Sequence, residues 1–165
     1  MFNAIGYAFD SNEQPDYQYF IGNKKQPELS KRYIELFHRV YQCAVEKNID
    51  TVVMSLVGAN IFAENYNDDN ITGKHHFQET VWAPALLVVM EQFPGIKTVM
   101  MGSGEAKAFR LEGTALANIE DTGYFPSQNA GKMEESELSK TMFVNAWDPW
   151  SMVGNGNNKD NSLAG

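Results

Sequence analysis

Residues 51–63 read TVVMSLVGANIFA, and the rest of the chain is organised around this stretch. Its first part, 51–57, is an apolar and mostly β-branched run of the length expected for a strand buried on both faces. At Gly58 it changes to small residues followed by the aromatic Phe62. In open α/β sheets ligands bind beyond the carboxyl ends of the strands, where small residues let backbone N–H groups approach an anion. The stretch is consistent with two interpretations, a ligand-binding strand end or a plain turn.

Segments of helical periodicity lie on both sides of this strand. Apolar residues recur in them at steps of three and four, and prolines mark the start of the first and the end of the second. Helices are predicted over 27–47 and 77–93, and strands over 2–9, 51–57, 96–101 and 141–146. The alternation predicts an α/β fold of three layers, a mostly parallel (mixed) sheet with right-handed crossovers and helices on both faces. Gly6, inside the first strand, predicts a bulge or a close approach of another backbone.

The remaining segments are mostly polar and contain many turn-forming residues. We expect a long, partly ordered loop over 10–26, an exposed loop over 64–77, a short helix or edge strand over 105–116, a connector over 118–132 and a short acidic helix or turn over 133–140. No repeat or boundary divides residues 1–165, so we expect one domain. The chain stops where a covering helix should start, so we expect either that the sequence is truncated or that its last element comes from a longer parent.

Composition narrows the class of protein. With 43% hydrophobic residues, the chain has the composition of a globular domain. Its net charge of -8 argues against a nucleic-acid-binding surface. The longest apolar run, 81–90, is about half of what a bilayer span needs, and no secretory signal opens the chain. Cys43 is the single cysteine, which permits a reduced compartment and indicates a buried structural thiol.

A metal site is a weak alternative. His75 and His76 follow Asp68 and Asp69 within one polar loop. Adjacent histidines on a helix point to different faces, and the sequence has no spaced second pair of histidines. We therefore predict no metal.

A second glycine-containing segment follows the last predicted strand. Residues 143–157 read FVNAWDPWSMVGNGN. In a parallel sheet the carboxyl ends of two strands can lie at the same edge, so this segment is predicted to face residues 58–63. Backbone amides around its glycines are suited to surround a diphosphate. The other interpretation is a flexible polar tail.

The two segments resemble the two ADP-ribose-binding segments of macrodomains. TVVMSLVGANIFA is similar to S-I-A-F-P-x-L-G-T-G-I-Y-G, with Gly58 and Phe62 on the motif's glycine and aromatic. FVNAWDPWSMVGNGN is similar to V-N-A-A-N-x-x-L-x-G-G-G-G, and residues 144–146 match it outright. The motif that usually comes first comes last here, as in a circular permutant, and such rearranged macrodomains resemble bacterial effector-type ADP-ribosyl hydrolases. The resemblance implies a permuted, macrodomain-like fold.

The resemblance also implies a role for each matching residue. Asn145 would orient the ribose, and Phe62 would pack on the sugar. The other implied ligand-binding residues are Gly154, Asn155, Gly156 and Asn157 along the phosphate path, and Gly58, Ala59, Asn60 and Ile61 as the opposing backbone amides. The chain departs from the motif at Asp148, which replaces its second asparagine, and at the two asparagines that interrupt the glycine run. The acidic residue that contacts adenine in the family has no secure counterpart.

Two carboxylates are candidates for catalysis. Asp148, beside the anomeric carbon, would activate a water or stabilise an oxocarbenium-like transition state, with Asp160 as the second acid of the pair. The alternative for Asp148, which precedes Pro149, is a turn or cap residue.

The residues and the resemblance together predict a protein that binds ADP-ribose, as ligand or product, and hydrolyses an ADP-ribosyl linkage, glycosidic or ester, on a modified protein. No cofactor is expected. A non-catalytic ADP-ribose reader would need the same two segments without a placed carboxylate. A third alternative is a protein-interaction module that docks a partner through Trp147 and Trp150. The resemblance implies a cytoplasmic location, or the host cytosol for a secreted effector.

Overall fold

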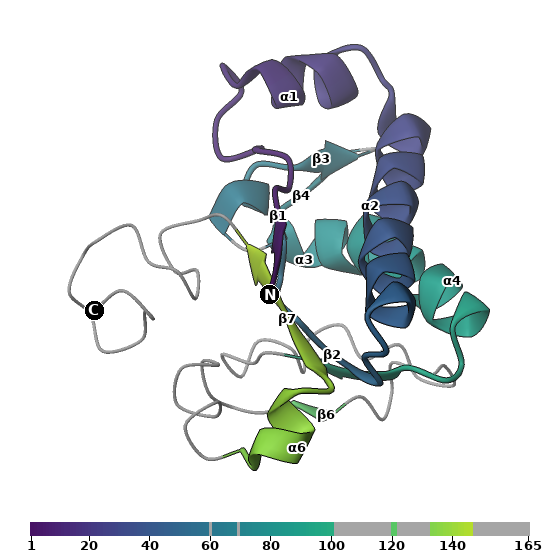
Figure 1. Cartoon of the computed structure of the whole chain (residues 1–165). Helices are drawn as coiled ribbons and strands as arrows, with labels where there is room; N and C mark the ends of the chain where they lie inside the picture. The colour runs from purple at the N-terminus through teal and green to yellow at the C-terminus, as the bar shows by residue number, and fades with distance from the viewer. Residues whose placement is uncertain (60, 69, 101–119, 122–132, 147–165) are drawn as a thin grey trace, which may run out of the picture.

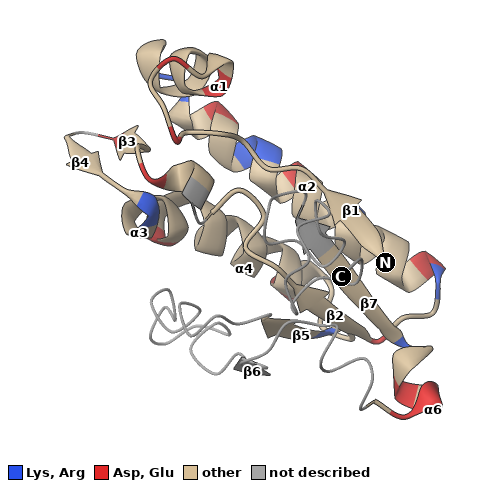
Figure 2. Cartoon of the chain, turned by 90° about the vertical axis from the view of Figure 1, so that its left-hand side faces the viewer, with Lys and Arg blue, Asp and Glu red and all other residues tan. Residues whose placement is uncertain are grey.

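Five parallel strands form the central sheet of the computed structural model, which describes residues 1–59, 61–68, 70–100, 120–121 and 133–146. In spatial order they are β1 (Phe2–Ala4), β7 (Thr141–Ala146), β2 (Thr51–Met54), β5 (Lys97–Met100) and β6 (Glu120–Asp121). Figure 2 shows β7 between β1 and β2. All pairings in this sheet are parallel, which confirms the predicted α/β class with a parallel sheet.

β7 pairs with its two neighbours along different parts of its length. Its first half pairs with β2, from Thr51 and Thr141 to Val53 and Phe143. Its second half pairs with β1, where the ladder continues to Ala4 and Ala146. Among the described residues, the last part of β7 thus has no ladder partner on β2, and the two strands separate at their carboxyl ends.

Two long helical segments pack against each other on one face of the sheet (Figure 1). The first is α2 (Gln26–Glu46); the second consists of α3 (Lys74–Phe77), a π-helical turn η3 (Gln78–Trp82) and α4 (Ala83–Gln92). Their buried side chains share one core with Val52 and Met54 of β2. No described helix combines the length and apolar composition needed to cross a bilayer.

The opposite face of the sheet carries a second, smaller apolar cluster. Strand residues alternate between the two faces, so Val53 lies opposite its neighbours, together with Val99 and Phe143, and the half-buried Met133 packs against them. α6 (Glu135–Leu138) confirms the predicted short acidic helix but buries no side chain. Both long helices belong to the first face, so the predicted helical layers are confirmed for one face among the described residues.

The long helices and the strands 96–101 and 141–146 were predicted to within three residues of their observed bounds. Other predictions were wrong. The strands predicted over 2–9 and 51–57 end at Ala4 and Met54. The predicted loop 10–26 contains α1 (Pro15–Tyr17) and the π-helical turn η1 (Gln18–Gly22). The predicted loop after Ala63 contains the hairpin β3 (Asn67–Asp68) and β4 (Ile71–Thr72), and the connector 118–132 contains β6. The segment 105–116 lies outside the described residues.

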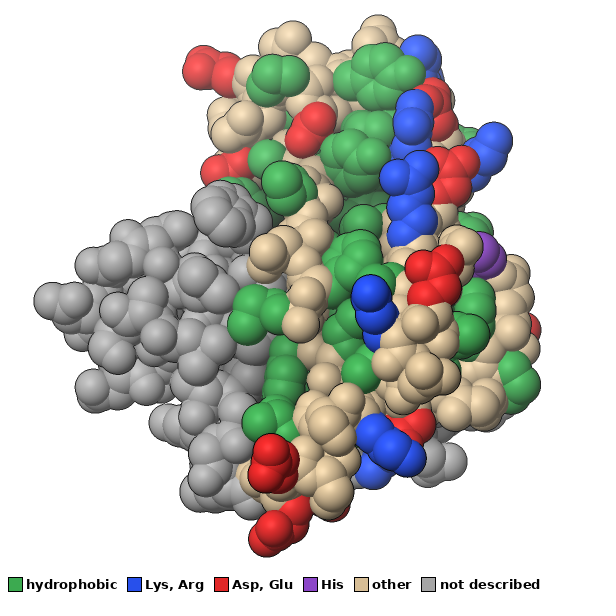
Figure 3. Space-filling view, in the orientation of Figure 1, with side chains coloured by type: hydrophobic (Ala, Val, Ile, Leu, Met, Phe, Trp, Pro, Cys, Tyr) green, Lys and Arg blue, Asp and Glu red, His purple; other side chains and the backbone are tan. Residues whose placement is uncertain are grey.

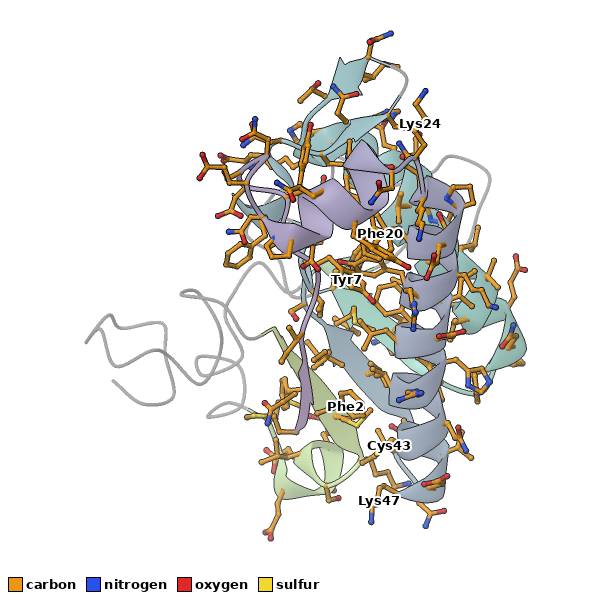
Figure 4. All side chains as sticks on the ribbon, turned by 90° about the horizontal axis from the view of Figure 1, so that it is seen from above. Phe2, Tyr7, Phe20, Lys24, Cys43 and Lys47 are labelled. Carbon is orange, nitrogen blue, oxygen red and sulfur yellow. The ribbon has the colours of Figure 1, made fainter. Side chains whose placement is uncertain are left out.

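Aromatic packing explains the structure that the segment 10–26 acquires. Phe20 is buried, and its ring contacts Tyr7 edge to face with centroids 4.9 Å apart. Figure 4 shows these two side chains next to each other beside α2. Phe20 also contacts Phe9, at 6.3 Å. These aromatic partners lie outside the polar segment 10–26, so no local sequence pattern indicates the contacts. The contacts stabilise the helical turns that begin at Pro15.

We expect stability to fall at alkaline pH through Tyr41. Its hydroxyl is hydrogen-bonded to Thr98 Oγ1 at 2.5 Å, and burial raises the pKa of Tyr41 to about 12. In the unfolded chain a tyrosine ionises near pH 10. The stabilisation is therefore complete below pH 10 and is lost as the pH rises towards 12. Urea unfolding at a series of pH values should show a shallower alkaline decline for Tyr41→Phe; identical pH dependence in both proteins would contradict the assignment.

Candidate functional site

The loops that follow β1 and β2 meet at two glycines. A Cβ atom on Gly6 would lie 2.5 Å from Gly58 Cα and 2.6 Å from its nitrogen. A Cβ on Gly58 would lie 2.9 Å from Gly6 Cα, and Gly58 has a φ of +69°. Side chains are excluded at both positions because the backbones touch. The close backbone approach predicted at Gly6 is confirmed, and its partner is the glycine that ends the predicted strand.

A tight turn ends β2 before Gly58. The N–H of Val57 donates to Ser55 O at 2.9 Å, and the N–H of Ala59 donates to Leu56 O at 3.0 Å. These local bonds replace the ladder, which is why the strand stops at Met54. The turn continues into η2 (Ile61–Ala63), a single 3-10 turn.

Further backbone hydrogen bonds join the two loops beyond the glycines. The N–H of Phe9 donates to Phe62 O at 2.5 Å, and the N–H of Asn65 donates to Phe9 O at 3.0 Å. The segment after β1 therefore runs alongside the segment after β2. Phe62 is half-buried in this arrangement.

Tyr33 of α2 connects the helix to both loops. Its hydroxyl accepts a hydrogen bond from the N–H of Tyr7 at 3.3 Å and donates to Val57 O at 3.3 Å. The side chain is completely buried, and burial raises the pKa of Tyr33 far above its ordinary value, against the hydrogen bond from Tyr7, which lowers it. The hydroxyl therefore stays protonated and able to donate throughout the physiological range.

Gln78 holds the same turn from the second helical segment. It is completely buried, and its Nε2 donates to Ala59 O at 2.6 Å. Its Oε1 is buried and has no hydrogen-bond partner in the described structure. Tyr33 and Gln78 thus bind the carbonyls on either side of Gly58.

Ser55 lies where β2 and β7 separate, one residue beyond β2. It is only 8% exposed, and its Oγ is buried without a hydrogen-bond partner within the described ranges. Buried hydroxyls in native proteins are nearly always paired, so an unpaired one calls for an explanation. A ligand with an acceptor or donor at this position would supply the missing partner.

The predicted site residues fall into three groups. Gly58 and Ala59 line the turn after β2, Phe62 lies in η2, and of Ile61 only the backbone position in η2 is described. Asn145 lies in β7, paired with Asn3 of β1. Asn60, Asp148, Gly154, Asn155, Gly156, Asn157 and Asp160, together with Trp147 and Trp150 of the alternative interpretation, lie outside the described residues.

A polar cavity of about 390 Å³ lies beyond the joined loops. Amide, hydroxyl and carboxylate side chains surround it: Asp10, Ser11, Asn12, Tyr17, Asn65, Asn67 and Thr72. Some are already paired, since Asn65 Nδ2 donates to Asp10 O at 2.5 Å and Asn67 Nδ2 donates to Thr72 Oγ1 at 2.8 Å. The sequence indicated only polar loops here, because the cavity forms between segments far apart in the chain.

The histidine pair gives no metal centre among the described residues. His76 Nε2 lies 4.0 Å from Asp68 Oδ2. The described ranges contain no group of three or more metal-ligating side chains. Cys43 is a free, half-buried cysteine.

The contacts of Tyr33 and Gln78 with the turn and the unpaired hydroxyl of Ser55 were not predicted from the sequence. Tyr33 fits the apolar periodicity of its helix and is buried, but its hydroxyl reaches the turn. Gln78 lies three and four positions before the apolar Val81 and Trp82, so helical periodicity places this polar side chain on the apolar face.

Comparisons with known proteins return no relative. No protein-family model matches the chain, and no significant match was found among curated proteins or among solved structures.

Proposed function

We propose that this protein binds ADP-ribose at the carboxyl ends of β2 and β7 and hydrolyses the bond between ADP-ribose and a modified protein. The observation that carries the proposal is the pairing of β2 with β7. The two macrodomain-like segments leave the sheet from these two strands, which are parallel neighbours although about ninety residues separate them in the sequence. Parallel neighbours end at the same edge, as a two-walled ligand site requires.

Backbone groups rather than charged side chains would bind the diphosphate. The chain carries a net charge of -8, so the overall field repels an anion. Figure 3 shows the Lys and Arg side chains gathered along α2, among acidic ones. One of them, Arg32, is paired with Glu28 at 3.3 Å. The glycine turn after β2 offers N–H groups without side chains in the way, which is the arrangement that binds phosphates in many proteins.

The hydrolytic step requires two proton transfers. A water oxygen forms a bond to the anomeric carbon of the ribose while the bond from that carbon to the carrier side chain breaks. One carboxylate accepts the proton that the water loses, and a second acid protonates the leaving group. Asp148, two positions after the last residue of β7, and Asp160 are the residues that we propose for these transfers.

Titration calorimetry with ADP-ribose tests the proposal. We expect saturable binding with a Kd on the order of 1 µM, or roughly 8 kcal/mol, and release of free ADP-ribose from an ADP-ribosylated protein. AMP serves as the control, because it lacks the diphosphate and the second ribose and should bind more weakly. Binding without any turnover would replace the hydrolase with a reader. An absence of heat with ADP-ribose would overturn both.

Ser55→Ala should weaken ligand binding without lowering stability. Removing a buried hydroxyl that has no partner should leave the free energy of unfolding unchanged or raise it. If Ser55 contacts the ligand, the same change should weaken ADP-ribose binding about fivefold, the effect of one hydrogen bond. Ser139→Ala is the control, since its hydroxyl donates to Ser136 O of α6, away from the turn after β2. Equal affinities for Ser55→Ala and the wild type would remove Ser55 from the site.

A further inference from the structure

We propose that Tyr33 and Gln78 are positioning residues of the ligand site, and that they fix the turn after β2 so that the backbone N–H of Gly58 faces the ligand. The proposal rests on the proposed function and adds to it the part of the fold that sets binding affinity. Neither residue belongs to the two macrodomain-like segments.

The two carbonyls that flank Gly58 both accept hydrogen bonds from buried side chains. Tyr33 binds Val57 O at 3.3 Å, and Gln78 binds Ala59 O at 2.6 Å. Both side chains come from the helical face of the sheet and are completely buried. The carbonyls of Val57 and Ala59, two residues apart in the turn, therefore point towards the helices.

The geometry of the peptide bond sets the direction of the N–H of Gly58. In a trans peptide the C=O and the N–H point in opposite directions, and no described peptide bond is cis. When the Val57 carbonyl is bound to Tyr33, the N–H of Gly58 points away from α2. No described residue accepts a hydrogen bond from this N–H. This donor is preorganised because its peptide plane is fixed from behind, and an anion that reaches the turn would supply the missing acceptor.

The contact with Gly6 restrains the same peptide from a third side. Gly6 is packed against Val57 C, Gly58 N and Gly58 Cα. Tyr33 also accepts the N–H of Tyr7, the residue after Gly6. One hydroxyl therefore fixes both loops relative to each other, so its loss should loosen the turn without opening the core.

A π-helical turn brings Gln78 into this position. Thr80 Oγ1 donates to His76 O at 2.7 Å and so competes for a carbonyl that an α-helical N–H would use. Pro84, at the start of α4, has no N–H to continue the α-helical ladder. Single π turns occur frequently at functional sites. The unpaired Oε1 of Gln78 is a cost to folding, which indicates a residue kept for its contact with the turn rather than for stability.

Tyr33→Phe, with Tyr41→Phe as its matched control, tests the proposal. Both tyrosines are on α2, both are completely buried, and each hydroxyl is hydrogen-bonded, but that of Tyr41 contacts Thr98 of β5 instead of the turn. Both substitutions remove one hydroxyl from the same helix and should lower the unfolding midpoint similarly. We expect only Tyr33→Phe to weaken ADP-ribose binding, about tenfold, and to accelerate amide hydrogen exchange in residues 57–59.

Gln78→Met supplies an independent second arm. Methionine keeps the length of the side chain and removes the bond to Ala59, so affinity should again fall about tenfold. The double variant Tyr33→Phe/Gln78→Met should lose less affinity than the product of the single losses, because either change already releases the turn.

The outcomes are distinguishable. If the wild type binds ADP-ribose and Tyr33→Phe binds equally well, or if Tyr41→Phe loses as much affinity, the positioning role is wrong and the proposed function stands. If the wild type does not bind ADP-ribose, the proposed function fails, and with it the link between this turn and affinity.

Discussion

Alanine at Gly6 is expected to destabilise the protein by about 3 kcal/mol, the upper end of the cost of overpacking a core. The new Cβ would lie 2.5 Å from Gly58 Cα, 2.6 Å from Gly58 N and 2.9 Å from Val57 C. All three are backbone atoms, so no side chain can rotate out of the way. The loops after β1 and β2 would have to separate, and ADP-ribose binding should be lost together with the stability.

Urea unfolding and calorimetry on the same variant measure both effects. Gly22→Ala is the control, because a Cβ at Gly22 meets nothing within 4 Å. It should leave stability and affinity near those of the wild type. Gly58→Ala should have a similar effect to Gly6→Ala. Its new Cβ would lie 2.5 Å from the Tyr33 hydroxyl, and the positive φ of Gly58 is unfavourable for alanine. Wild-type stability of Gly6→Ala would mean that the two loops are not in contact in solution.

Asp148→Asn should abolish hydrolysis while leaving binding intact. The amide keeps the shape of the carboxylate but cannot accept a proton from water, so turnover should fall by roughly 10²- to 10⁴-fold, the usual contribution of a general acid or base. Asp160→Asn should have a comparable effect if the two act as a pair. Release of ADP-ribose from an ADP-ribosylated protein measures turnover, and calorimetry measures binding.

A carboxylate at the other end of the sheet serves as the control. Asp50 immediately precedes β2 and lies 3.9 Å from Lys140, so it belongs to the amino-terminal edge. Asp50→Asn should hydrolyse at the wild-type rate. If Asp148→Asn lowers the unfolding midpoint instead of the turnover, Asp148 is the turn or cap residue of the alternative interpretation. Wild-type turnover in both the Asp148 and the Asp160 variant would exclude the catalytic pair.

Ser55 and Gln78 also bear on how the site is stabilised. Each has a buried polar atom without a partner in the described structure, and both lie next to the turn after β2. Such atoms cost free energy in folding, and proteins commonly accept that cost where a ligand binds. Ser55→Ala, which removes one such atom, is therefore expected to keep or raise stability while it lowers affinity.

The sequence by itself determined the local elements of this fold. α2, β5 and β7 lie close to their predicted bounds because steps of three and four, and short β-branched runs, depend only on residues near one another in the chain. It also indicated Gly6 as a point of close approach and residues 51–63 as a strand that ends in a turn. The macrodomain resemblance, the permuted order and the roles of Asp148 and Asp160 remain predictions.

Only the tertiary structure decided which segments meet. β7 lies between β1 and β2, Gly6 contacts Gly58, and the side chains of Tyr33 and Gln78 bind the turn from two helical segments. These contacts join residues from 19 to 142 positions apart, and no periodic pattern encodes a partner at such a separation. Periodicity reports which face of an element is buried, whereas the atom that a buried hydroxyl or amide binds is set by how the elements pack.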